Sequence, residues 1–189
     1  MKSPFNFIVR PYNGRRYDNI KKIGDVDLII SSSQEDHTVS NRYATVISTP
    51  ISYSGEITPG DTLIVHHNVF KYFYDMKGRQ KSGKSFLIDD LFLVDDFQYY
   101  LYKHNNEWKS KDEFCFIKPI DKEEFYLSST GSEQPLMGTV RYTNNILKSY
   151  GVNEGDIVSF KPDAEYEFNI DGEKLYRVMT DWITWTQEK

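Results

Sequence analysis

Four stretches in the first third of the chain decide the fold: IVRP at residues 8–11, LII at 28–30, YATV at 43–46 and PGDTLIV at 59–65. The apolar and β-branched residues of the first, third and last stretches predict short strands. Gly60 and Asp61 are typical of a turn that leads into a strand. Residues 31–42 have almost no apolar side chains, so we expect a mobile loop beside the LII tripeptide.

The composition of the chain predicts an all-β protein. Aromatic residues make up 15% of its 189 residues, and 11 Gly and 7 Pro divide it into short segments. Aromatic rings pack well on pleated sheets, whereas frequent Gly and Pro interrupt helices. The formal net charge of −5 argues against general nucleic-acid binding, which needs a net basic face, but it leaves a local basic patch open.

The cysteine count and the hydropathy indicate the cellular compartment. The single cysteine, Cys115, excludes an internal disulfide and a cysteine-based zinc site. It stands between Phe114 and Phe116, which is typical of a buried structural thiol. No apolar run approaches the roughly 18 residues of a membrane span, and the first residues, MKSP, lack the apolar core of a signal peptide. We therefore expect a cytoplasmic protein with no membrane partner.

The second half of the chain repeats the motifs of the first half in the same order, which predicts an internal duplication. The paired stretches are 8–11 with 116–119, 44–47 with 138–142, 59–63 with 154–158, and 91–98 with 175–183. Residues 103–112 have the composition of a linker. The sequence therefore predicts two domains, 1–104 and 113–189.

The two copies differ in the loop region. Pro11 and Gly60 are 49 positions apart, whereas Pro119 and Gly155 are 36 positions apart. The candidate tripeptide of the second copy, at 125–127, follows Pro119 by only six positions. Because short connections restrict reach, we expect the first copy to carry the active loop and the second copy to be structural.

This order of motifs resembles the co-chaperonin family, whose bacterial type is the single-domain GroES-like protein. The elements that carry the resemblance are Arg10-Pro11, Leu28-Ile29-Ile30, Tyr43-Ala44-Thr45-Val46, Pro59-Gly60-Asp61 and residues 96–100, with counterparts at 118–119, 125–127, 138–140, 154–156 and 181–185. The chain departs from the family pattern in having Val26-Asp27 before the tripeptide and an insertion over residues 70–90.

The resemblance implies two tandem GroES-like, partly open β-barrels that assemble into a homo-oligomeric ring. It also implies a partner and a site. Leu28, Ile29 and Ile30 would dock into an apolar groove of a GroEL-like chaperonin ring, with Phe125, Tyr126 and Leu127 as the possible second-copy equivalent. The expected function is to cap a chaperonin folding cage.

Two alternatives remain open at this point. Three consecutive apolar residues at 28–30 also fit an ordinary buried strand. The same β-barrels would also suit a structural assembly protein, for example a component of a phage particle. That is the alternative function.

The chain offers weak signals for catalysis or metal binding. Residues 78–85, GRQKSGKS, match the phosphate-loop pattern G-x-x-x-x-G-K-S, which requires a helix to follow. The strand-like stretch 86–91 is too short for that helix, so the match predicts an exposed hairpin tip. His66 and His67 are expected on opposite faces of a strand. We find no catalytic constellation and no metal-ligand spacing, and expect neither an enzyme nor a cofactor.

Overall fold

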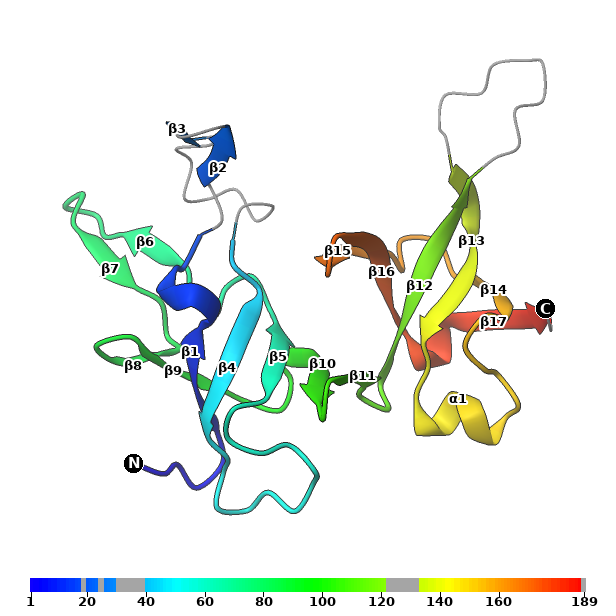
Figure 1. Cartoon of the computed structure of the whole chain (residues 1–189), viewed down its shortest axis with the longest axis horizontal. Helices are drawn as coiled ribbons and strands as arrows, with labels where there is room; N and C mark the ends of the chain where they lie inside the picture. The colour runs from blue at the N-terminus through cyan, green and yellow to red at the C-terminus, as the bar shows by residue number, and fades with distance from the viewer. Residues whose placement is uncertain (18–19, 24–25, 30–39, 122–132, 188–189) are drawn as a thin grey trace. The chain divides into compact units, whose positions relative to one another are not determined.

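The structure is a computed structural model that describes residues 1–17, 20–23, 26–29, 40–121 and 133–187. Their regular secondary structure is mostly strand, with only short helical segments, so the predicted all-β class is confirmed (Figure 1). The chain divides into two compact units, Met1–Glu107 and Trp108–Lys189. Among the described residues, no helix combines the length and apolarity that a membrane crossing requires.

The first unit is built on six strands in the order β10-β5-β4-β1-β9-β8; the sheet adds β11 beside β10, and β11 starts at the last residue of the unit, Glu107. These strands are β1 (Phe7–Pro11), β4 (Tyr43–Ser48), β5 (Thr62–Val65), β8 (Phe86–Ile88), β9 (Leu91–Val94), β10 (Tyr99–His104) and β11 (Glu107–Ser110). Two hairpins form sheets of their own: β2 (Ile20–Ile23) with β3 (Val26–Ile29), and β6 (Tyr72–Tyr74) with β7 (Gln80–Ser82). A single 3-10 turn, η1 (Tyr12–Gly14), follows β1.

The second unit contains a six-stranded sheet with the order β15-β16-β12-β13-β14-β17. Its elements are β12 (Phe114–Asp121), β13 (Glu133–Tyr142), α1 (Asn145–Ser149), β14 (Ile157–Phe160), β15 (Tyr166–Ile170), β16 (Glu173–Met179), η2 (Thr180–Trp182) and β17 (Ile183–Gln187). In both large sheets the described strands end at two edges, so neither sheet is closed.

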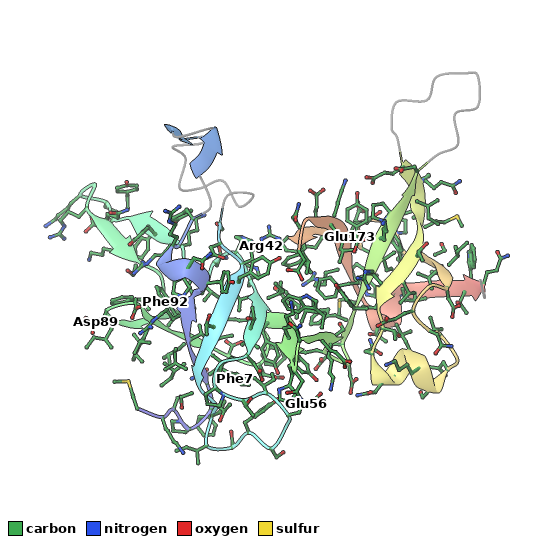
Figure 2. The ribbon with its side chains drawn as sticks, viewed as in Figure 1. Phe7, Arg42, Glu56, Asp89, Phe92 and Glu173 are labelled. Atoms are coloured by element: carbon green, nitrogen blue, oxygen red, sulfur yellow. The ribbon has the colours of Figure 1, made fainter. Side chains whose placement is uncertain are left out.

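Each unit buries its own apolar core, and the period-two pattern of the strands explains which residues enter it. On β4, Ala44 and Val46 are buried while Ile47 is exposed; on β9, Phe92 and Val94 are buried (Figure 2 labels Phe92). Full burial of one such large side chain contributes about 1.5–3 kcal/mol. The core of the second unit includes Cys115, Ile117, Val140, Leu147, Val158, Phe160 and Val178.

The two sheets share one strand plan. Six strands of the first unit, in the order β10-β5-β4-β1-β9-β8, correspond to β17-β14-β13-β12-β16-β15 of the second. The registers correspond as well: Val9 is opposite Val46 and Pro11 is opposite Ala44, as Ile117 is opposite Val140 and Pro119 is opposite Gly138. Both ladders are irregular one residue earlier, between Ile8 and Val9 and between Phe116 and Ile117.

The turn before β5 and the turn before β14 also have the same hydrogen bonds. The Gly60 N–H donates to Val46 O and the Gly155 N–H donates to Val140 O, each at 2.8 Å. Both glycines have positive φ, 99° and 95°, which a side chain would oppose. The repeated sequence motifs therefore occupy equivalent places in the two sheets.

Three details differ from the sequence-based expectations. In the fourth pair of motifs, Gln98 corresponds to Trp182. The His66 N–H donates to Gln98 O, and the Lys161 N–H donates to Trp182 O in the same way. The sequence comparison paired Asp96 with Asp181, and the structure shifts this alignment by one residue. The linker-like segment 103–112 contains the end of β10 and the whole of β11. The short helix α1, whose first turn is capped by the Asn144 side chain on Leu147 N–H, was not predicted.

Candidate functional site

The predicted docking tripeptide begins on a hairpin that is separate from the seven-stranded sheet. Leu28 and Ile29 lie on β3, where their backbones pair with Lys21 and Ile20 of β2. Figure 1 shows β2 and β3 as a hairpin in the connection between β1 and β4. Ile30 lies outside the described residues, so the assignment of the three residues as a docking site stays a prediction.

Asn41 fixes the point where this connection returns to the sheet. Its side chain is buried, and its Nδ2 donates to Tyr12 O at 2.9 Å and to Arg15 O at 2.7 Å. Its Oδ1 accepts from the Tyr43 N–H at 2.9 Å, and its own N–H donates to Arg16 O at 3.0 Å. One amide side chain therefore holds together the outgoing and returning ends of the connection.

Arg16 and Tyr17 attach the outgoing end to the inserted β6–β7 hairpin. The Arg16 guanidinium carbon lies 4.1 Å from the ring centroid of Tyr72 and 4.6 Å from that of Phe92, and Nη1 donates to Ser82 Oγ at 2.9 Å. Burial lowers the pKa of Arg16. The Tyr17 hydroxyl accepts from the Tyr72 N–H at 2.8 Å. Cation–π contacts of this kind contribute about 0.5–2 kcal/mol each.

The expected mobile loop over residues 31–42 is only partly described. Residues 31–39 lie outside the described residues. Ser40 and Asn41, at its end, are buried, and Ser40 pairs with Tyr17. The expected mobile loop therefore does not extend to these two residues, and Asn41 is held by hydrogen bonds from its side chain to the backbone.

The second unit has a corresponding connection between β12 and β13, the strands equivalent to β1 and β4. Phe125, Tyr126 and Leu127 belong to this connection and lie outside the described residues. Its base is formed by the pair Asp121 and Glu133. The side chain of Glu133 accepts hydrogen bonds from the Tyr176 hydroxyl at 2.6 Å and from Lys174 Nζ at 2.9 Å, which lower its pKa.

The phosphate-loop match lies in a hairpin. Residues 78–85 run from the β6–β7 turn through β7 to the beginning of β8, and no helix follows. Asp75 organises the turn, because its carboxylate accepts the N–H groups of Lys77 and Arg79 and the Nε of Arg79. The predicted exposed hairpin tip is confirmed.

Histidine and cysteine side chains supply no metal centre in the described part of the chain, where no group of three potential ligands occurs. The prediction that His66 and His67 diverge is wrong: their ring centroids are 4.1 Å apart, since both residues follow β5 and are not part of it. Cys115 is buried, as its aromatic neighbours predicted, and burial raises its pKa to about 12.

Sequence reasoning missed the anchoring residues Asn41, Arg16 and Tyr17. An Asn two residues before a strand is a recognisable signal, because Asn side chains bond to nearby backbone groups. The partners of Arg16 come from residues 72, 82 and 92, and no local pattern connects these positions. Searches of protein-family models and of curated proteins found no match to the chain.

Proposed function

We propose that this protein is a non-enzymatic co-chaperonin, built from two tandem GroES-like, partly open β-barrels, that caps a chaperonin ring. The observation that carries the proposal is the pairing of β3 with β2 alone among the described strands, in a connection whose base is anchored by Asn41. A fixed base and a separate hairpin suit the presentation of an apolar segment to a partner.

The energetics favour a multivalent contact. Burial of one Leu-Ile-Ile segment is worth a few kcal/mol, at about 25 cal/mol per Å², and ordering the segment reduces that gain. One contact alone is weak. Several copies in a homo-oligomeric ring would bind together, because the first contact raises the effective concentration of the others.

Capture of a GroEL-like chaperonin in the presence of ATP tests the proposal. Leu28→Ser and Ile29→Ser should abolish capture, since each removes an apolar anchor. Lys21→Ser is the matched control, because Lys21 pairs with Leu28 in the same hairpin but offers no apolar surface. Equal capture by the Leu28→Ser, Ile29→Ser and Lys21→Ser variants would contradict the proposal.

A structural assembly protein is the second candidate, and a groove in the second unit favours it. A pocket of about 670 Å³ lies between α1, η2 and the edge strand β17. Its lining includes Ile146, Tyr150 and Trp185, which are all exposed large apolar residues. Exposed apolar surface beside an edge strand is typical of an interaction site.

For a structural assembly protein, the groove would be filled by a second copy of the chain, because a homo-oligomeric assembly is built by repeating one contact between identical subunits. Sedimentation should then show large assemblies that Trp185→Glu dissociates, with no capture of chaperonin by the unaltered protein. Assemblies that survive Trp185→Glu would contradict this second candidate.

A further inference from the structure

The inserted β6–β7 hairpin creates a pocket for which the second unit has no counterpart. Between β14 and β16 the second unit has only β15, which corresponds to β8, so the hairpin is an addition to the shared plan. The pocket has a volume of about 400 Å³. Its lining includes Lys71, Tyr72, Phe73, Lys84, Ser85 and Gln98.

The charge of this hairpin is opposite to that of the whole chain. Residues 71–84 contain five cationic side chains and one carboxylate, a local formal charge of +4 in a chain of −5. Arg79 and Lys81 are paired with Asp75, at 3.0 and 3.6 Å. Lys71 and Lys84 have no ion pair among the described residues, and both line the pocket. Two uncompensated ammonium groups in one pocket favour an anionic ligand.

Gly83 lets the two backbone segments that carry Lys71 and Lys84 approach each other closely. Its N–H donates to Lys71 O at 3.1 Å. A Cβ at this position would lie 3.3 Å from Lys71 O, which is closer than most Cβ contacts. The absence of a side chain at residue 83 therefore permits this close approach of the backbones.

The rest of the lining offers one aromatic face and an oriented polar group. Phe73 is 48% exposed, which is unusual for a ring in a pocket wall. Ser85 is buried, and its Oγ accepts from Gln98 Nε2 at 3.4 Å. Gln98 Oε1 accepts from the Asp95 N–H at 3.2 Å, which fixes the orientation of the amide. The Ser85 hydroxyl proton remains available to an acceptor on a ligand.

We propose that this pocket binds a nucleoside phosphate, with the phosphate on Lys71 and Lys84 and the base against Phe73. Lysine ammonium groups bind phosphate oxygens as point charges, and every base offers a face for stacking on an aromatic ring. The end of the GRQKSGKS motif takes part through the Lys84 and Ser85 side chains, without the helix N-terminus of a phosphate loop. A free mononucleotide and one nucleotide of single-stranded nucleic acid both offer this combination of a phosphate and a base.

Titration calorimetry on the full chain tests the proposal with three probes: AMP, inorganic phosphate and a ten-residue oligothymidylate. Lys71→Ala and Lys84→Ala should each weaken AMP binding by about tenfold or more, because each removes a charge-assisted contact. Phe73→Leu should weaken AMP binding by about fivefold or more and leave phosphate binding unchanged. Lys77→Ala is the matched control, since Lys77 lies in the turn and does not line the pocket.

The results distinguish a free mononucleotide from a single strand as the ligand, and binding in the pocket from diffuse charge attraction. Tighter binding of AMP than of phosphate, with the variant effects above, supports the pocket. Tighter binding of the oligonucleotide than of AMP, with the same variant effects, supports a single strand as the source. Equal losses in Lys77→Ala and Lys84→Ala would overturn the site in favour of diffuse charge attraction. No binding of any probe by a folded chain would also overturn it. Chaperonin capture is measured separately and does not depend on these results.

Discussion

Arg10 and Lys118 occupy the same register position in the two sheets, and each is ion-paired with an acid near the turn that leads into the neighbouring strand. Arg10 Nε lies 2.6 Å from Asp90 Oδ2, and Lys118 Nζ lies 2.8 Å from Glu173 Oε1. Arg141 Nε also contacts Glu173, at 2.9 Å, and Figure 2 labels this glutamate. The cation before each proline thus has a structural role in both copies.

Glu173→Gln should lower the stability of the second unit in a pH-dependent way. Lys118 and then Arg141 lower the pKa of Glu173, so its contribution is present above the unfolded pKa and is lost as the pH falls through the lower folded value. Solvent screens these half-exposed groups, so the expected loss at pH 7 is below about 1 kcal/mol. Urea unfolding should show the loss at pH 7, and the loss should shrink as the pH falls below the unfolded pKa of the carboxyl. Glu165→Gln, at an exposed glutamate, is the control, and an equal loss in both variants would contradict the prediction.

Gly138→Ala should be strongly destabilising, although the equivalent residue in the first unit is alanine. A Cβ on Gly138 would lie 2.6 Å from Lys118 O and would overlap the Ile117 side chain. Because Lys118 O belongs to the backbone, the strands must separate, at a cost of about 1–3 kcal/mol. Ala44→Gly, the reverse change at the equivalent position, should cost about 1 kcal/mol or less. Thermal unfolding of both variants measures the difference, and a Gly138→Ala protein as stable as the original would refute the clash.

Cys115 should be inert to a thiol reagent in the native protein. The thiol is buried, and burial raises its pKa to about 12 from 9.0. Since the thiolate is the reacting form, Ellman's reagent at pH 8 should label the thiol only after unfolding in urea. The raised pKa also predicts that stability falls as the pH rises above about 9, because only the unfolded state then loses the proton. Cys115→Ala should reduce this fall, and rapid labelling of native protein would contradict the burial.

Asp61→Ala should destabilise its unit more than Asp156→Ala destabilises the other. Asp61 Oδ2 accepts the Thr58 N–H at 2.7 Å and lies 2.8 Å from His104 Nδ1. Asp156 Oδ2 accepts only the equivalent amide, of Asn153 at 2.7 Å, among the described contacts. One hydrogen bond contributes about 1 kcal/mol, so losses of about 2 and about 1 kcal/mol are expected in urea unfolding. The Thr58 hydroxyl also donates to Asp61 Oδ2, at 3.2 Å, so similar losses in both variants would show that neither this bond nor the His104 contact adds stability.

The sequence predicted the all-β class and the matching motifs because both depend on short-range patterns. Alternation on β4 and β9 and the Gly-Asp turns at residues 60–61 and 155–156 are local signals. A repeat makes each signal stronger, since two independent copies agree. The register is conserved even where the residue changes, as at Ala44 and Gly138.

The anchoring of the candidate site was not predictable because it depends on contacts between distant residues. Arg16 reaches Tyr72, Ser82 and Phe92, which come from an inserted hairpin and from the core. Asn41 binds carbonyls nearly thirty residues earlier. The pocket beside Phe73 was not predicted either, because a hairpin tip in the sequence gives no sign that Lys84 and Ser85 line a pocket with Lys71 and Gln98.

The corresponding registers of the two sheets show where the chain accommodates additional segments. Additions such as the β6–β7 hairpin occur in a connection, where they leave every ladder of the shared plan intact. One half can therefore carry extra residues without any change in the strand pairing that both halves share. New recognition surfaces on this chain would be sought first where one half has gained residues that the other never acquired.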